Sequence, residues 1–434
     1  MDTKEVEQYL IDFQKKELPI LIHRPVPTFS EKKINVVIGP RRAGKTSFLF
    51  QIMRDMVSSG RIKEDIIYLN LENTRLFDIQ FKDIPPLIGI HIRLFPSTQK
   101  PVVFIDEPQN VAMWEKAVRD IYDDGFQIFI SGSSSKLLSK EIATSLRGRS
   151  LSYLLLPFSF TEFLKANDHK VGPIQSSEEK IKTLALLDKY LQFGEYPEIV
   201  LEKDNNTKQK ILENYLDLTV YKDIIERHGI KDSLLVKWLI KSIMSSYTKE
   251  VSINKLYTTL KSQGRKVSKD ELYTLASLIN DSFFAIYLPK FSYSIRKREP
   301  TGKAYLCDTG FAGLIDSSVD TGKKMENVVF LELTRRQETG SEIFFWKTQS
   351  EEVDFVIKKG AIVTQLIQVS KQGSDEKTKE REVRALLKSS KALNCRDLLI
   401  ITQDKEATEE TEWYGIKGKI RFIPLWKWLL KNES

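Results

Sequence analysis

The sequence predicts an α/β protein whose first 160 residues form an αβα sandwich around a parallel sheet. Two observations support this prediction. Between residues 34 and 160, short runs rich in β-branched and aromatic residues alternate with longer amphipathic stretches, the pattern of buried strands joined by helices. The first of these runs leads through a glycine-rich loop into an apolar helix start, the order that a βα unit requires.

Five apolar runs are expected to form the strands of this sheet. Each is compatible with a strand buried on both faces, and strands joined by helices pair in parallel. Residues 1–160 are therefore predicted to be one domain, with an amphipathic helix at the N-terminus. The runs are INVVIG (34–39), IIYLNLE (66–72), PVVFIDE (101–107), FQIFISGS (126–133) and LSYLLLPF (151–158).

Three further regions follow this domain. Residues 161–250 carry apolar residues at helical spacing and are predicted to be an all-helical lid or connector. Residues 251–317 contain two short helical patterns and then two strand-like runs, which is the order of a winged helix. Residues 318–434 combine a helix, three strands, a charged helix and two more strands, and are predicted to form a separate α/β domain.

The composition is that of a folded protein with several domains. The chain has 434 residues, more than one core usually organises, with 41% hydrophobic and 29% charged residues. Its two cysteines, Cys307 and Cys395, indicate neither a disulfide framework nor a zinc site. No apolar run is long enough to cross a bilayer and no signal peptide is seen, so we expect a cytoplasmic protein without a membrane partner. A net charge of +8 is compatible with nucleic-acid binding but does not require it.

The glycine-rich loop matches a phosphate-binding P-loop. Its spacing is GxxxxGK[ST], and it lies between a strand and a helix. Glycines let backbone N–H groups close around phosphates at a helix N-terminus, while Lys45 is placed to meet the β and γ phosphates and Thr46 to coordinate Mg²⁺. This narrows the fold to a P-loop NTPase (AAA/ASCE-like) with ATP and Mg²⁺ as cofactors. The residues expected to bind the nucleotide are Gly39, Pro40, Arg41, Arg42, Ala43, Gly44, Lys45, Thr46 and Ser47.

An acidic pair ends the third predicted strand, at the edge of the sheet where ligands bind in open α/β folds. Asp106 is expected to hold Mg²⁺ through water. Glu107 is expected to orient and activate the attacking water, because phosphoryl transfer depends on positioning and charge compensation. The alternative is that both are ordinary acidic residues at a strand end.

Serines and arginines complete the predicted site. The segment after the fourth strand offers Ser131, Ser133 and Ser134 as polar sensors of the γ-phosphate; which of them acts stays open, and Ser133 is included among the nucleotide-binding candidates. Arg147 and Arg149 precede the fifth strand, and either is a candidate arginine finger for the nucleotide of a neighbouring subunit in a homo-oligomer. A structural or solvated role fits these arginines equally well.

The chain resembles a large archaeal and bacterial family of AAA-like ATPases that carry a winged helix and a restriction-endonuclease-like C-terminal domain. The resemblance covers nearly the whole chain and implies an ATP-driven protein that acts on or near nucleic acid. It rests on short blocks in the family's order, GPRRAGKTS, YLNLEN, FIDEPQ, SGSSSKLLS, LRGRS, LLPFSFTEFL, FGEYPEIV, LCDTGFAGL, ENVVFLEL and EEVDFVI.

The predicted winged helix is rich in basic residues. Arg296, Lys297 and Arg298 are candidate DNA contacts, since such a cluster would neutralise phosphates. The alternatives are a solvated basic face and a protein-binding module. Other basic residues expected on the same surface are Lys290 and Lys303 near Tyr293, and Lys255, Lys261, Arg265 and Lys266 on the preceding helix and turn.

The resemblance implies that the C-terminal domain is similar to the PD-(D/E)xK nucleases. Glu326 and Asp354 match the first two acidic positions of that motif. Gln368 and Ser370 stand where the motif needs an acid and a lysine, and Lys371 is displaced by one residue, which puts it on the opposite face of a strand. We therefore expect a degenerate nuclease site without cleavage activity.

Three functions remain in competition. The main hypothesis is an ATPase that couples hydrolysis to a conformational change of a DNA-engaging C-terminal half. The second is a nucleotide-dependent switch, similar to STAND-type ATPases, that binds a protein partner. The third, an ATP-dependent nuclease, is disfavoured by Gln368 and Ser370. Stimulation of turnover by DNA would distinguish the first from the second.

Overall fold

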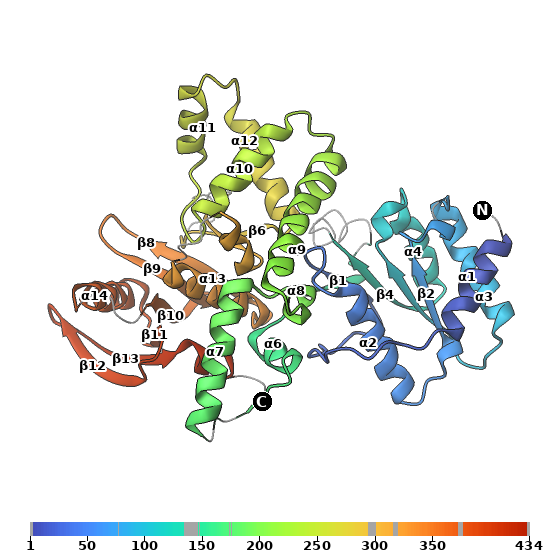
Figure 1. Cartoon of the computed structure of the whole chain (residues 1–434), viewed down its shortest axis with the longest axis horizontal. Helices are drawn as coiled ribbons and strands as arrows, with labels where there is room; N and C mark the ends of the chain where they lie inside the picture. Colours follow the sequence, from blue (N-terminus) through green and yellow to red (C-terminus); the bar gives the residue numbers. More distant parts are fainter. Residues whose placement is uncertain are drawn as a thin grey trace. The chain divides into compact units, whose positions relative to one another are not determined.

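A computed structural model of the chain describes residues 3–76, 78–133, 146, 148–172, 174, 176–293, 301–315, 320–371 and 376–431 (Figure 1). Contacts divide the chain into two compact units, Met1–Leu155 and Leu156–Ser434. Among the helices in these ranges, none combines the length and the apolar character needed to cross a membrane.

The first unit is built on a five-stranded parallel sheet with the strand order β2-β3-β4-β1-β5. Its strands are β1 (Ile34–Ile38), β2 (Ile66–Asn70), β3 (Val102–Asp106), β4 (Gln127–Gly132) and β5 (Ser150–Leu154). Its helices are α1 (Thr3–Lys15), α2 (Lys45–Ser58), α3 (Ile84–Leu94) and α4 (Trp114–Asp123), with short 3₁₀ turns at Lys63–Asp65, Thr74–Leu76, Phe81–Asp83 and Pro108–Asn110.

All five predicted strands of this sheet are present, and their parallel pairing is confirmed. The core beside them includes Phe104 and Phe129 on neighbouring strands, whose rings stack 4.8 Å apart. The expectation that all five strands are buried on both faces is wrong for β5. This strand lies at the sheet edge, so Leu151 keeps 44% of its surface exposed.

The second unit begins with helices. They are α6 (Phe160–Ala166), α7 (Ser177–Phe193), α8 (Pro197–Leu201), α9 (Asn205–Leu218), the π-helix η6 (Thr219–Glu226), α10 (Ser233–Ser245), α11 (Ile253–Ser262) and α12 (Lys269–Asp281). Many of them start behind a serine or aspartate whose side chain accepts a backbone N–H bond from the first turn, which fixes the helix start. These capping residues are Ser159, Ser176, Asp204, Asp232, Ser252 and Ser268.

After α12 come β6 (Ala285–Leu288) and β7 (Lys303–Leu306), which pair antiparallel, and the 3₁₀-helix η8 (Thr309–Leu314). The predicted order of two helices and two strands is therefore present, while a winged-helix fold stays a prediction. A single hydrophobic core runs from Tyr196 to Ala312 and includes side chains from α10, α11, α12 and both strands. The predicted helical connector and the predicted winged helix thus share one core.

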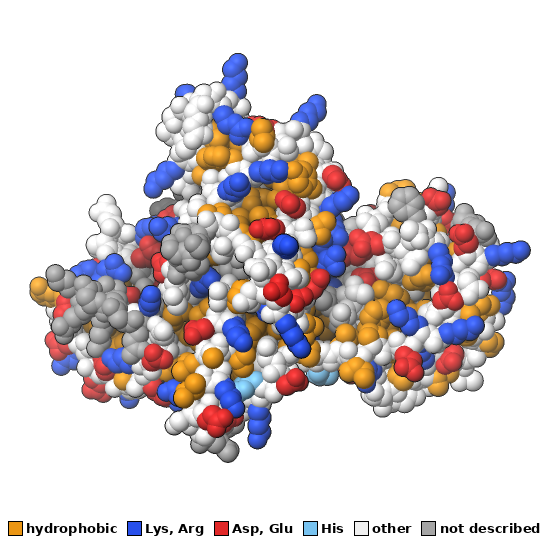
Figure 2. All heavy atoms as spheres, in the orientation of Figure 1, with side chains coloured by type: hydrophobic (Ala, Val, Ile, Leu, Met, Phe, Trp, Pro, Cys, Tyr) orange, Lys and Arg blue, Asp and Glu red, His pale blue; other side chains and the backbone are white. Residues whose placement is uncertain are grey.

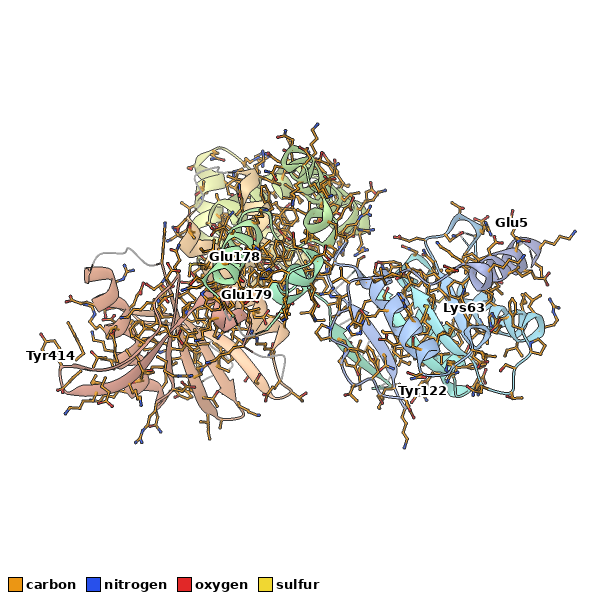
Figure 3. All side chains as sticks on the ribbon, turned by 60° about the horizontal axis from the view of Figure 1, so that its bottom comes forward. Glu5, Lys63, Tyr122, Glu178, Glu179 and Tyr414 are labelled. Carbon is orange, nitrogen blue, oxygen red and sulfur yellow. The ribbon has the colours of Figure 1, made fainter. Side chains whose placement is uncertain are left out.

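The last part of the second unit contains a six-stranded mixed sheet with the order β12-β13-β11-β10-β9-β8. Its strands are β8 (Ser341–Lys347), β9 (Glu352–Lys359), β10 (Ile362–Ser370), β11 (Leu398–Thr402), β12 (Ala407–Trp413) and β13 (Ile416–Pro424), and its helices are α13 (Thr321–Arg335), α14 (Glu376–Leu393) and α15 (Leu425–Leu429). α14 packs on β9, β10 and β13. A tight turn with left-handed backbone at Tyr414 and Gly415 joins β12 to β13, and Tyr414 projects from it (Figure 3).

A buried carboxylate joins two of the sequence blocks, FGEYPEIV and LCDTGFAGL. Asp308 accepts N–H bonds from Glu195 and Tyr196 at 2.6 and 2.9 Å, and from Gly310 at 2.7 Å. Gly194 has a left-handed φ of 89°, and a Cβ there would lie 1.8 Å from Asp308 Oδ1. The corner between α7 and α8 therefore requires glycine at position 194.

Candidate functional site

The P-loop connects the end of β1 to the start of α2. Its backbone takes left-handed conformations at Arg42 and Gly44, with φ of 67° and 91°. Gly39 approaches the neighbouring edge strand so closely that a Cβ would lie 2.0 Å from Leu155 O. Glycine at positions 39 and 44 is thus required by a close approach and by a backbone turn, and the loop opens at the N-terminus of α2.

A buried arginine that the sequence analysis did not single out forms a hydrogen bond with the backbone of the P-loop. Arg24 Nη1 donates to Ala43 O at 3.0 Å, and Gln51 of α2 exchanges two hydrogen bonds with the Arg24 backbone at 2.8 and 2.9 Å. Both side chains are buried. No local motif marks Arg24, because its role depends on a contact with a loop some twenty residues further along the chain.

Lys45 and Thr46 point toward the loop and the acidic pair. Lys45 Nζ donates to Pro40 O at 3.0 Å and lies 3.9 Å from Glu107 Oε1. Thr46 Oγ1 donates to Asp106 Oδ2 at 2.7 Å. The structure therefore brings together the P-loop and the end of β3, as the sequence predicts.

Asp106 is buried and accepts three side-chain hydrogen bonds. Besides Thr46, Tyr68 OH donates to Oδ2 at 3.0 Å, and Ser131 Oγ donates to Oδ1. Burial raises the pKa of Asp106, and these hydrogen bonds oppose the rise because they favour the ionised form. The three donors hold the carboxylate toward the P-loop.

Glu107 takes a left-handed backbone conformation with φ of 50°. Its Oε2 accepts bonds from the backbone N–H and the hydroxyl of Ser133, both at 3.2 Å, and from Gln109. A non-glycine residue in this conformation is costly, and such strain is common at functional sites. Of the predicted sensor serines, Ser131 thus contacts Asp106 and Ser133 contacts Glu107, while Ser134 lies outside the described residues.

The remaining predicted nucleotide-site residues are placed as follows. Arg41 pairs with Glu72 at 3.6 Å, and Ser47 is exposed on the first turn of α2.

Arg149 lies at the start of β5, beside the start of β1. The P-loop follows the other end of β1, so Arg149 and the P-loop lie at opposite ends of these strands. The guanidinium of Arg149 pairs with Asp123 at 2.8 Å and lies 5.4 Å from the centre of the Tyr122 ring. Arg149 does not reach the P-loop of its own chain, and Arg147 lies outside the described residues.

The basic segment of the predicted wing is only partly described. Arg296, Lys297 and Arg298 lie outside the described residues. The expectation that Lys303 belongs to an exposed basic surface is wrong, because its side chain is 4% exposed and lies among carboxylates. On the face shown in Figure 2, Lys and Arg side chains stand out over the region of α11 and α12.

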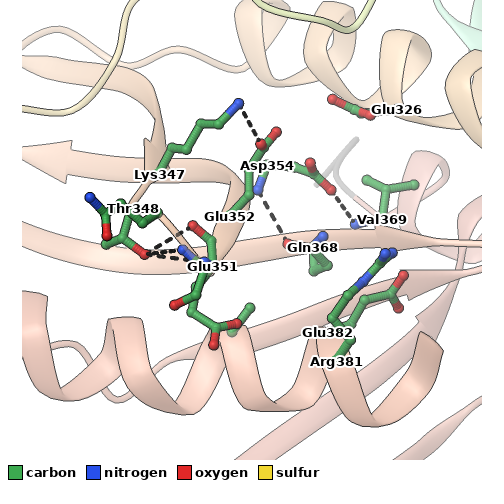
Figure 4. Close-up of a pocket in the computed structure, with 13 residues that line it drawn as sticks. Glu326, Lys347, Thr348, Glu351, Glu352, Asp354, Gln368, Val369, Arg381 and Glu382 are labelled. Carbon is green, nitrogen blue, oxygen red and sulfur yellow. Dashed lines mark hydrogen bonds and ion pairs between the residues drawn. The ribbon is translucent and has the colours of Figure 1, made fainter. Parts of the chain in front are cut away.

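A second site lies in the C-terminal sheet. A pocket of about 460 Å³ is lined by residues of α13, the end of β8 and the turn after it, β9, β10 and α14 (Figure 4). The predicted residues Glu326, Asp354 and Gln368 come together in it. Gln368 Oε1 accepts from the Asp354 N–H at 3.2 Å, and Asp354 Oδ2 accepts from the Val369 N–H at 3.1 Å. The amide therefore stands beside the carboxylate at the position where the nuclease motif needs an acid.

A carboxylate that the sequence analysis missed forms another side of this pocket, and the predicted residue Ser370 contacts it. Glu382 of α14 lines the pocket, and burial raises its pKa to about 7, while a hydrogen bond with Ser370 opposes the rise. Lys371 is exposed and follows the end of β10 at Ser370. Helix α14 was predicted only as a charged helix, so nothing in the sequence pattern distinguished Glu382 from its other charged residues.

Comparisons with known proteins agree with the first of these sites. Residues 31–164 match a family model described as an AAA domain. Two further models, both described as domains of unknown function, match residues 184–319 and 321–428. The AAA part of the predicted resemblance is thus confirmed, while the winged helix and the endonuclease-like domain stay predictions.

Two curated relatives extend over most of the chain. An uncharacterized protein of Methanocaldococcus jannaschii is 39% identical over 92% of this chain and 88% of its own length. An uncharacterized protein of Haemophilus influenzae is 30% identical over 75% of this chain and 80% of its own length. Among solved structures, a DNA polymerase III gamma subunit-related protein of Thermotoga maritima matches 64% of this chain and 99% of its own length, at 13% identity and a TM-score of 0.25.

Proposed function

Since this chain belongs to the archaeal and bacterial family of AAA-domain proteins that includes these relatives, we propose that it binds and hydrolyses Mg-ATP. The observation that carries the proposal is the convergence of the P-loop with the acidic pair. Lys45 lies 3.9 Å from Glu107, and Thr46 lies 2.7 Å from Asp106. Phosphoryl transfer needs a cation, a hydroxyl and carboxylates beside the phosphate-binding loop, and this site brings such groups together.

The residues present fit a magnesium ion. The hydroxyl of Thr46 is a hard oxygen ligand, and the carboxylate of Asp106 could hold the ion through water, while Mg²⁺ also uses phosphate oxygens. When bound, the ion would offset negative charge on the phosphates. In this proposal the P-loop N–H groups and Lys45 hold the phosphates, Asp106 and Thr46 hold the metal, and Glu107 accepts the proton of the attacking water.

Lys45→Ala tests the assignment of the site. The substitution removes the P-loop ammonium group, so nucleotide binding should weaken and phosphate release should fall by roughly 100-fold or more, of the order of losing one preorganised charge in an active site. Lys32→Ala, at an exposed lysine of the same unit, is the matched control and should leave turnover unchanged. Unchanged turnover in folded Lys45→Ala would contradict the assignment.

We further propose that hydrolysis is coupled to binding of DNA by the second unit. Exposed lysines on α11, α12 and the turn between them support this proposal, and they include Lys255, Lys261 and Lys266. Lys261 and Lys269 lie 5.9 and 5.5 Å from the ring centre of Tyr257, so cations and an aromatic ring occur together on this surface. Such a surface suits a phosphate backbone.

The candidate arginine fingers belong to the same proposal. Arg149 and the P-loop of the same chain lie at opposite ends of β1 and β5. A catalytic role for Arg149 would therefore require the nucleotide of a second copy of the chain. Turnover per chain that rises with protein concentration, and that falls in Arg149→Ala, would support a homo-oligomer with a finger in trans. Concentration-independent turnover with an active Arg149→Ala variant would assign this arginine a structural role.

A further inference from the structure

Three carboxylates of the C-terminal domain surround one lysine, Lys303, which does not belong to the sheet of that domain. Lys303 Nζ lies 2.8 Å from Glu352 Oε1, 2.9 Å from Asp354 Oδ1 and 3.1 Å from Glu326 Oε1. Lys303 belongs to β7, whereas Glu326 lies on α13 and the other two carboxylates on β9. The pocket beside them is shown in Figure 4.

The backbone that carries Lys303 is tightly held. A Cβ at Gly302 would lie 1.9 Å from Leu288 O, so the preceding residue must be glycine to let β7 approach β6. Thr301 Oγ1 donates to Val251 O at 3.1 Å, and Lys303 pairs with Leu288 in the antiparallel register. These contacts fix the backbone of the strand that carries the ammonium group of Lys303.

Tyr305 supports the same arrangement from the same face of β7, since side chains two residues apart in a strand point the same way. Its hydroxyl donates to Glu326 Oε1 at 2.7 Å, and its ring stacks on Phe330 of α13 at 4.2 Å. Glu326 is thus held by two residues of β7 and directed at the lysine.

An ammonium group has three N–H donors, and here each has a carboxylate oxygen at hydrogen-bond distance. Burial favours the neutral amine, but Asp354 and Glu326 raise the pKa of Lys303 well above its ordinary value. A divalent ion bound by these carboxylates would need their oxygens about 2.0–2.2 Å from its centre, in the space that Nζ fills. Among the residues that the structure describes, no group of three or more His, Cys, Asp or Glu is arranged to hold a metal ion.

We propose that the ammonium group of Lys303 is the resident cation of this acidic site, and that the site takes no divalent cation while Lys303 is in place. The lysine thereby ties the β6–β7 hairpin to the C-terminal sheet. This adds a second obstacle to nuclease chemistry, beyond the replacements at Gln368 and Ser370: the carboxylates that remain already have a cation bound to them.

The test is a titration of the full chain with Mn²⁺ in the absence of nucleotide. Electron paramagnetic resonance measures the Mn²⁺ that stays free at each step of the titration. The wild type and Asp354→Asn should bind the same amount of Mn²⁺, because Asp354 is occupied by Lys303. Lys303→Met keeps an unbranched side chain that is one atom shorter and removes the charge, so it should gain about one Mn²⁺ per chain, as freed carboxylates are suitable Mn²⁺ ligands. The gain should disappear in the double variant Lys303→Met with Asp354→Asn.

Three results would overturn the proposal. The first is Mn²⁺ binding by the wild type that is lost in Asp354→Asn. The second is a Lys303→Met variant that folds, as judged by circular dichroism, and gains no Mn²⁺. The third is Mn²⁺-dependent DNA cleavage by the wild type that Lys303→Met abolishes, which would make Lys303 a catalytic lysine. If Lys303→Met does not fold, the comparison of the wild type with Asp354→Asn, repeated with Glu326→Gln, still decides between occupancy by lysine and occupancy by metal.

Discussion

The hydroxyl of Tyr68 lies 3.0 Å from Asp106 Oδ2, in the middle of a site otherwise built from P-loop and strand-end residues. The backbone of β2 around Tyr68 is fixed by α1, because the hydroxyl of Tyr9 donates to the Tyr68 carbonyl and accepts from the Asn70 N–H. The sequence predicts Thr46 and Asp106 from motif spacing. It predicts only burial for Tyr68, because the apolar pattern of β2 does not reveal which neighbouring strand its hydroxyl faces.

Tyr68→Phe keeps the ring and removes the hydroxyl, so Asp106 loses one of its three donors. A buried hydrogen bond to a charged group contributes about 1.5–3 kcal/mol, so the Mg²⁺ concentration needed for half-maximal turnover should rise roughly tenfold or more. The measurement is phosphate release against Mg²⁺ concentration. Tyr153→Phe, on the edge strand, is the matched control. Identical Mg²⁺ dependence in the Tyr68 variant would remove Tyr68 from the metal site.

At the scale of elements, the predictions succeed where the pattern is local. The strands of the first sheet have near-continuous apolar runs, and capping residues such as Ser159 and Ser268 mark helix starts. β12 was missed because the stretch Ala407–Trp413 has no apolar run; its half-buried residues alternate with exposed polar ones. The corner at Gly194 could not be predicted either, because Asp308, which requires it, lies more than a hundred residues away.

That corner gives a pH dependence. Burial raises the pKa of Asp308 from 3.8 to about 6, although three N–H groups favour its ionised form. Between these values the folded state binds more protons than the unfolded state, so this group's contribution to stability is present below pH 3.8 and is lost as the pH rises through 6. A shift of this size corresponds to on the order of 3 kcal/mol.

Asp308→Asn cannot titrate and should lose this pH dependence. The gap in unfolding free energy, taken as wild type minus Asp308→Asn, should therefore decrease between pH 4 and pH 7, because only the wild type loses stability as Asp308 ionises. Urea unfolding followed by tryptophan fluorescence at several pH values measures this gap. A gap that stays constant with pH would show that Asp308 does not titrate in this range.

At the scale of the whole molecule, two kinds of information are missing from a single sequence. Strand order and the burial of charge depend on contacts between distant segments. Lys303 shows this most clearly: within the basic segment it suggested a DNA contact, yet the fold surrounds it with Glu326, Glu352 and Asp354. The lysines of α11 and its following turn remain on the surface, and they carry the DNA-binding proposal.

Replacing Lys255, Lys261 and Lys266 with alanine should weaken DNA binding and reduce DNA-stimulated turnover, while turnover without DNA stays unchanged. The slope of log affinity against log salt should flatten by roughly 0.9 for each lysine that contacts a duplex phosphate. A matched triple variant at the exposed lysines 203, 210 and 231 controls for net charge. Equal slopes for both variants would move the DNA surface elsewhere, and turnover indifferent to DNA would favour the nucleotide-dependent switch.

The central claim is that Glu107 activates water at an ATP site built by the P-loop. The most direct measurement uses Glu107→Gln, which keeps the size of the side chain and removes the base. After incubation with ATP and Mg²⁺, the nucleotide that remains bound is separated and identified. The wild type should retain ADP, whereas Glu107→Gln should retain ATP and release phosphate about 100-fold to 10,000-fold more slowly, as expected for the loss of a general base. ADP on the variant, formed at the wild-type rate, would contradict the account.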